Sequence, residues 1–273
     1  MFEVKVNRTR FEAAVSMMSV IYHATVFGIR KTQTNAIIAL LVNITQTLML
    51  VAVFFVMMSV MGLRGSAVRG DFLLYILSGV FMFMSNIKVL NAVFKAASST
   101  SALMLHSPMN TLVSIISTAI GSLYIQVLSV FCVLSVYSLA VRPIEIYDPA
   151  GAFAMLLLAW FNGISVGVVF LALRPWFPQF TEIATTFYTR ANMFASGKML
   201  LGNTIPSVML VLFTWNPLFH IIDQTRGYVF INYNPHYSNA TYPLVVSCVL
   251  LVLGMMGESY TRRHASISWS ARQ

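Results

Sequence analysis

Charge is what this sequence has least of. Charged residues make up only 9% of the 273 positions, whereas an ordinary soluble domain has roughly a quarter. Apolar residues make up 58%, and several windows have the ~20 mostly apolar residues that a membrane span needs. The composition excludes an ordinary soluble protein. It predicts an all-α membrane protein with a single membrane domain covering residues 1–273.

Acidic residues are also scarce, at 8 in the whole chain. Outside the tails they fall in expected loops or near helix ends, so no carboxylate relay for proton or sodium coupling is predicted, which argues against a secondary transporter. The five histidines lie on separate segments without metal-ligand spacing. The two cysteines, Cys132 and Cys248, sit in apolar windows, where a thiol behaves as a small hydrophobe.

A phosphate-binding loop is missing as well. Ser196-Gly197-Lys198 lacks the upstream glycine and the following Ser or Thr of a Walker A motif. We therefore expect no enzyme activity and no cofactor on this chain. If ATP drives the protein, ATP and Mg²⁺ bind to a partner subunit.

Six membrane spans are expected from the apolar windows. They cover about 36–61, 72–94, 109–139, 151–173, 183–213 and 243–257. The fifth window is interrupted by Gly197, Lys198, Gly202 and Pro206, so it need not be one continuous helix. The expected organisation is a cytoplasmic tail and interface helix over 1–35, a six-helix domain over 36–257 and a second tail over 258–273.

An amphipathic segment precedes the first span. Between residues 11 and 29, apolar side chains recur every three or four positions, with Glu12, Ser16, Ser19 and His23 between them. This period predicts a helix lying on the membrane surface. The alternative is a frayed tail before the first span.

Most lysines and arginines outside the spans fall on the side of the two termini. The positive-inside rule then places both termini of this multi-pass protein in the cytoplasm. Lys88 is the one cation well inside a span. It is expected near the cytoplasmic end of the second span, where its stem can reach the headgroups.

The polar stretch before the last span predicts a short helix of its own. Asn216 followed by Pro217 is typical of an N-cap and a first helical position. His220, Asp223 and Arg226 then follow at steps of three along one face. We expect this helix to dip into the membrane without crossing it.

These residues resemble a known family. Trp215-Asn216-Pro217-Leu218-Phe219-His220, followed by Asp223 and Arg226, is similar to the loop before the last span in permease subunits of type-2 ABC exporters. The resemblance is to the group that exports capsular polysaccharide and O-antigen, and it is closest over about 170–260. Phe177-Pro178, Ile205-Pro206 and Pro108 match further prolines of that group.

One departure lies in the first span. The family usually has a Gly-x-Leu-Trp element and a proline there, whereas this chain has Asn43 where the proline would fall. The substrate therefore stays open between a polysaccharide and a drug, lipid or smaller glycoconjugate. A non-transport membrane enzyme or anchor is the second alternative.

The resemblance implies roles and partners. Trp215, Asn216, Pro217, His220, Asp223 and Arg226 would form a re-entrant outer gate. Ser99, Leu103, Leu105, His106 and Pro108 would belong to a coupling helix that docks on the ATPase. The implied partners are a nucleotide-binding ABC ATPase subunit, a second copy of this chain, the polysaccharide, export proteins of the periplasm or outer membrane, and membrane lipid, with no nucleic acid.

Aromatic side chains are plentiful, at 13% of the sequence. Sugars stack their apolar C–H faces on rings, so Phe54, Phe83, Trp160, Tyr188 and Trp215 are candidates for lining a substrate path. The competing interpretation is that such rings face lipid or form the usual aromatic belts at membrane interfaces.

Overall fold

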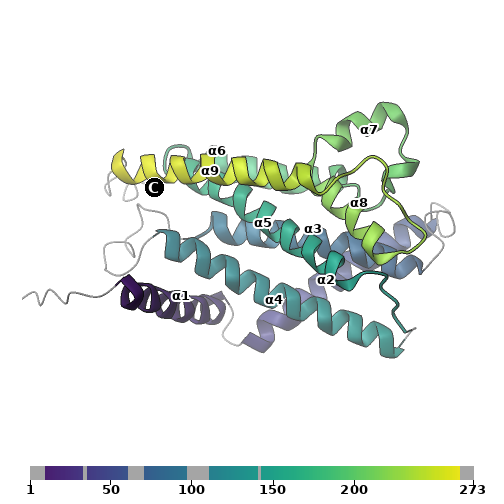
Figure 1. The fold of residues 1–273 in the computed structure, drawn as a ribbon, viewed down its shortest axis with the longest axis horizontal. Coiled ribbons are helices and arrows are strands. Elements are labelled where there is room, and N and C mark those ends of the chain that lie inside the picture. The colour runs from purple at the N-terminus through teal and green to yellow at the C-terminus, as the bar shows by residue number, and fades with distance from the viewer. Residues whose placement is uncertain (1–9, 33–35, 61–70, 97–110, 141–142, 265–273) are drawn as a thin grey trace, which may run out of the picture.

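The computed structural model describes residues 10–32, 36–60, 71–96, 111–140 and 143–264 (Figure 1). Over these ranges the chain is helical and contains no strand, as the sequence predicts. The helices are α1 (Arg10–Thr32), α2 (Ala36–Val60), α3 (Phe72–Phe94), α4 (Thr111–Ala140), α5 (Pro149–Leu173), α6 (Pro178–Ala195), α7 (Ser207–Thr214), α8 (Pro217–Val229) and α9 (Thr241–His264), with a 3-10 turn at Gly202–Thr204.

Five of the described helices are long and apolar enough to cross a membrane, namely α2, α3, α4, α5 and α9. They contain 23 to 30 residues within their spans. At ~1.5 Å per residue each exceeds the ~30 Å of a hydrocarbon core. The prediction of a membrane-embedded helical protein is supported by these five helices.

The fifth expected window is not one helix. Its first part belongs to α6, which carries Glu182 and Arg190 and is not among the five candidate spans. An irregular segment over 196–206 follows, and only then does the eight-residue α7 begin. The predicted interruption near Gly197 is confirmed, whereas the fifth expected span, over 183–213, is not one of the five candidate helices, so the count of six spans is not confirmed.

The centre of the bundle is α3, which packs against α2, α4, α5 and α8. Its backbone approaches α5 so closely that a Cβ on Gly163 would lie 2.4 Å from the carbonyl oxygen of Asn86. At this contact Asn86 donates to the Ala159 carbonyl at 3.0 Å and to Asn162 at 2.9 Å. Asn162 in turn donates to Ser247 on α9. Small and amide side chains thus join α3, α5 and α9, as in membrane helix packing generally.

A second polar network joins α2, α3 and α4. The Asn43 amide donates to Ser129 and, at 3.3 Å, to Gln126, while its oxygen accepts from the Lys88 ammonium. Lys88 therefore points to a partner inside the bundle, and the expectation that it reaches the headgroups is wrong for this structure. Buried polar side chains in such a bundle are satisfied by one another.

The amphipathic N-terminal segment forms α1, which packs along α4 and touches α2. Its apolar side chains are left uncovered, since Phe11, Val15, Met18 and Tyr22 are all exposed. An uncovered apolar stripe is what a helix at a membrane surface presents to lipid. The start of the described chain at α1 and its end at α9 lie at the same end of the bundle (Figure 1).

Candidate functional site

The residues singled out before the last span come together at the end of the bundle where α3, α5 and α9 begin. Helices α7 and α8 lie at this end (Figure 1), and α8 packs against α3, α5, α7 and α9. Helix α8 begins at Pro217 and ends at Val229, so the prediction of a short helix from Pro217 to about 230 is confirmed.

The start of α8 is held by Asn216. Its side-chain oxygen accepts from the Leu218 backbone N–H at 3.0 Å, and Pro217 occupies the first helical position. The Asn216 amide also donates to the Asn192 side chain at 2.8 Å and to the Ala195 carbonyl at 2.9 Å. One residue therefore caps α8 and ties it to the end of α6.

Replacing Asn216 with Ala should lower the free energy of unfolding by roughly 2 kcal/mol, because the cap and two further hydrogen bonds are lost. Asn216→Asp keeps the acceptor for α8 but not the donors to α6, so its effect should be intermediate. Thermal unfolding in detergent would measure both. Asn232→Ala, at an exposed position after α8, is the control, and equal unfolding of all three variants and wild type would contradict the assignment.

Among the residues that the structure describes, Arg226 is the largest fully buried side chain, with 0% of its surface exposed. It donates to the carbonyls of Gly197 at 3.1 Å and Leu200 at 2.6 Å, and also to that of Lys198. Its guanidinium carbon lies 4.2 Å from the ring centroid of Tyr75 on α3. These three carbonyls belong to the irregular segment after α6, where only that of Gly197 also accepts from a backbone N–H, that of Leu200 at 3.0 Å. A buried carbonyl without a donor is costly. Arg226 thus replaces the missing helix donors.

The irregular segment turns at Gly197. Its φ of +65° lies in the left-handed region that favours glycine. A Cβ there would also lie 2.5 Å from the ring of Phe219 on α8. Glycine at this position allows the chain both to reverse and to pass directly over α8.

Asp223 collects three donors from two other segments. Its carboxylate accepts from the Gly202 backbone N–H at 3.1 Å, from the Ser238 hydroxyl at 2.7 Å and from the Tyr233 hydroxyl. Burial, and then the Asp223 charge, raise the pKa of Tyr233, so the phenol remains a donor. Asp223 therefore holds the irregular segment and the loop after α8 against one face of that helix.

His220 bridges two further backbone groups. Its Nδ1 accepts from the Asn239 N–H at 3.1 Å, which assigns the ring proton to Nε2, 2.9 Å from the Thr214 carbonyl. Burial lowers the pKa of His220 and outweighs the opposing effects of that carbonyl and of Asp223. A neutral ring satisfies both contacts, so His220 connects α7, α8 and the start of α9.

Lys198 is the residue of this site that sequence reasoning missed. It is 3% exposed, and its ammonium lies 3.4 Å from the ring centroid of Phe83 and 4.7 Å from that of Phe54. Within the described residues, this nitrogen has no hydrogen-bond partner. A lysine in an apolar window is itself a signal of function in membrane proteins, and that signal was available in the sequence.

The candidate path aromatics are not brought together. Phe54 and Phe83 are buried and meet only around Lys198. The other three lie apart: Trp160 donates to the Ala119 carbonyl at 2.9 Å, Tyr188 packs on Phe170, and the Trp215 ring is 79% exposed. The coupling-helix residues Ser99, Leu103, Leu105, His106 and Pro108 lie outside the described residues.

The cluster is built to hold segments together. It contains a carboxylate, a guanidinium and an imidazole, each bonded mainly to backbone groups or hydroxyls, and the described part of the chain contains no group of three or more His, Cys, Asp or Glu that could hold a metal. Comparison of the sequence with protein-family models and with curated proteins gives no match. The resemblance to the permease subunits of type-2 ABC exporters therefore rests on the motif residues alone.

Proposed function

We propose that this chain is the membrane-spanning permease subunit of an ATP-binding cassette exporter that moves a polysaccharide of the capsular or O-antigen type across the bacterial inner membrane. ATP hydrolysis takes place on a separate nucleotide-binding chain, and two permease chains form the channel. The five candidate spans and the motif at 215–226 support this proposal.

The observation that carries the proposal is the broken element at the motif. A membrane accepts non-helical backbone only where protein covers it or where it lines an aqueous cavity, and interrupted helices are characteristic of transporters. Here Arg226 donates to carbonyls of the irregular segment, and Asp223 binds the same segment at Gly202. These contacts support the proposal that the motif residues hold a membrane-embedded gate.

The proposed topology follows from this element. Helix α6, the segment 196–206 and α7 together form a broken helix that is the fifth of six spans, α8 is the re-entrant gate helix, and both termini are cytoplasmic. The interface helix is α1, with its exposed apolar stripe toward the lipid. The segment with Leu103 and Leu105 docks on the ATPase.

The departure of the first span from the family pattern has a packing explanation. Asn43 replaces the expected proline, and its side chain bonds to Lys88, Gln126 and Ser129. The presence of Asn at position 43 is therefore explained by the hydrogen bonds that its side chain makes between α2, α3 and α4. The departure is therefore compatible with the polysaccharide substrate.

The purified chain alone should neither bind nor hydrolyse ATP, because the sequence has no phosphate-binding loop. Co-purified with its nucleotide-binding subunit in lipid, it should form a complex whose ATPase activity responds to the lipid-linked glycan. In cells, deletion of this chain should leave the glycan on the cytoplasmic side. Nucleotide turnover by the isolated chain, or unchanged surface glycan after deletion, would overturn the proposal.

A further inference from the structure

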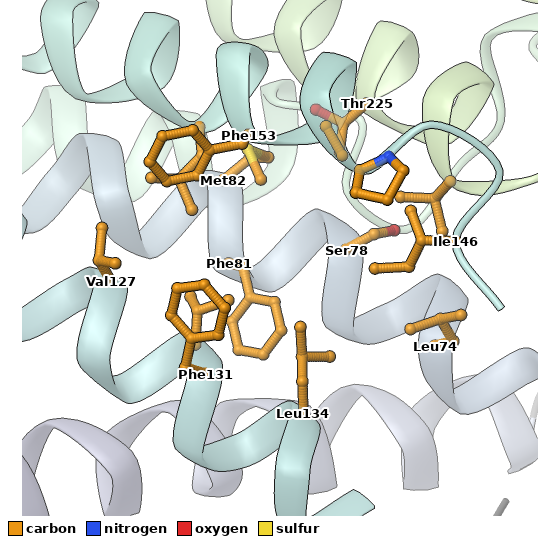
Figure 2. A pocket seen from close by; sticks show the side chains of 15 residues that line it. Leu74, Ser78, Phe81, Met82, Val127, Phe131, Leu134, Ile146, Phe153 and Thr225 are labelled. Carbon is orange, nitrogen blue, oxygen red and sulfur yellow. The ribbon is translucent and has the colours of Figure 1, made fainter. Parts of the chain in front are cut away.

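An apolar cavity of about 170 Å³ lies between α3, α4, α5 and α8 (Figure 2). Leu74, Ser78 and Phe81 line it from α3, and Val127, Phe131 and Leu134 from α4. The bundle therefore leaves room for a bound molecule at this position.

The surface of the cavity favours hydrocarbon. Its two hydroxyls are already used, since Ser78 donates to the Tyr75 carbonyl at 2.8 Å and Thr225 donates to the Ile221 carbonyl at 2.7 Å. The other lining side chains are apolar. A sugar would lose its hydrogen bonds to water here without replacement, whereas an alkyl chain would lose nothing.

The mouth of the cavity lies between α4 and α5. Phe131 on α4 and Phe153 on α5 line it and are 59% and 45% exposed, whereas Phe81 and Thr225 at its floor are 4% and 1% exposed. Figure 2 shows these side chains around the space. Because both helices are candidate spans, the mouth of the cavity opens to the hydrocarbon core of the bilayer.

A second cavity of about 490 Å³ adjoins the first and shares Leu74, Ile146 and Val229 with it. It is also lined by Asp71 and Glu145. Asp71 caps the first turn of α3, so this cavity lies at the end of the bundle, at headgroup level. An apolar cavity that adjoins one with two carboxylates at the membrane surface matches the division of a lipid into acyl chain and headgroup.

We propose that the two cavities form a binding site for one membrane lipid. Part of its acyl chain enters between α4 and α5, and its headgroup lies at the second cavity, beside Asp71 and Glu145. The acyl chain contacts Thr225 and Val229 on α8, the helix that carries Asp223 and Arg226. The site rests on the membrane embedding of the bundle and does not depend on the exporter function.

The test uses the full chain in bilayers of phosphatidylglycerol and phosphatidylethanolamine, with part of the phosphatidylethanolamine carrying a diazirine in the acyl chain. After illumination, mass spectrometry maps the labelled residues. Labels are expected on Ser78, Thr225 and Val229, the buried residues at the floor of the cavity. A lipid acyl chain reaches these residues only through the cavity. Labels confined to exposed side chains would overturn the site.

Variants separate entry into the cavity from general lipid contact. Ala152→Trp fills the cavity and should reduce floor labelling several-fold, while the smaller Ala152→Leu should reduce it partly if the tryptophan variant fails to fold. Val136→Trp, at an exposed position of α4 outside the lining, is the matched control and should leave floor labelling unchanged. Equal floor labelling in a folded Ala152 variant and wild type would contradict the proposal.

Discussion

Replacing Arg226 with Met is expected to lower the free energy of unfolding by roughly 3–5 kcal/mol, because the carbonyls of Lys198 and Leu200 lose their donor and that of Gly197 keeps only the Leu200 N–H. Met fills much of the same space, so the loss reports hydrogen bonding more than packing. Thermal unfolding in detergent would measure it. Export in cells should fail with the same substitution, since the irregular segment is no longer held on α8.

Two further variants define what Arg226 contributes. Arg226→Lys keeps the charge, but an ammonium lacks the planar fork of donors, so it should recover only part of the lost stability. Arg262→Met removes an exposed arginine from the last turn of α9 and should have little effect. If Arg226→Met unfolds like wild type, the guanidinium does not support the broken segment, and the account of the motif is wrong.

Replacing Lys198 with Met is expected to act in the opposite direction on stability, raising the free energy of unfolding by about 1–4 kcal/mol. A buried ammonium with two aromatic neighbours and no hydrogen bond within the described residues has lost its hydration without full compensation, and an apolar replacement of such a group often stabilises. Cation–π contacts offset only about 2 kcal/mol of that cost.

The same variant should export poorly. A costly buried charge in a membrane domain is expected to have a function, and Lys198 lies in the segment that α8 covers. Unfolding curves and surface glycan would be measured together, with Lys95→Met, at the exposed C-cap of α3, as control. A destabilised Lys198→Met would show that the lysine holds Phe54 and Phe83 in place, and normal export would remove it from the gate.

The sequence alone determined the features that depend on neighbouring residues. The start of α8 follows from Asn216 and Pro217, because a cap and a fixed φ act within one helical turn. The break near Gly197 follows from glycine and proline in an apolar window in the same way. The apolar windows predicted five of the helices that can span a membrane, since span length follows directly from bilayer thickness.

Only the tertiary structure decided which of these elements meet. Arg226 binds carbonyls up to 29 residues away, and Asn43 binds Ser129 at a separation of 86 residues. From the sequence, Lys198 was predicted only to interrupt an apolar window, and the side chain of Lys88 was predicted to reach the headgroups. A local pattern does not reveal which partner a buried cation has in the folded protein. The cavity between α4 and α5 was equally invisible, since its lining comes from four helices and its existence depends on how closely they pack.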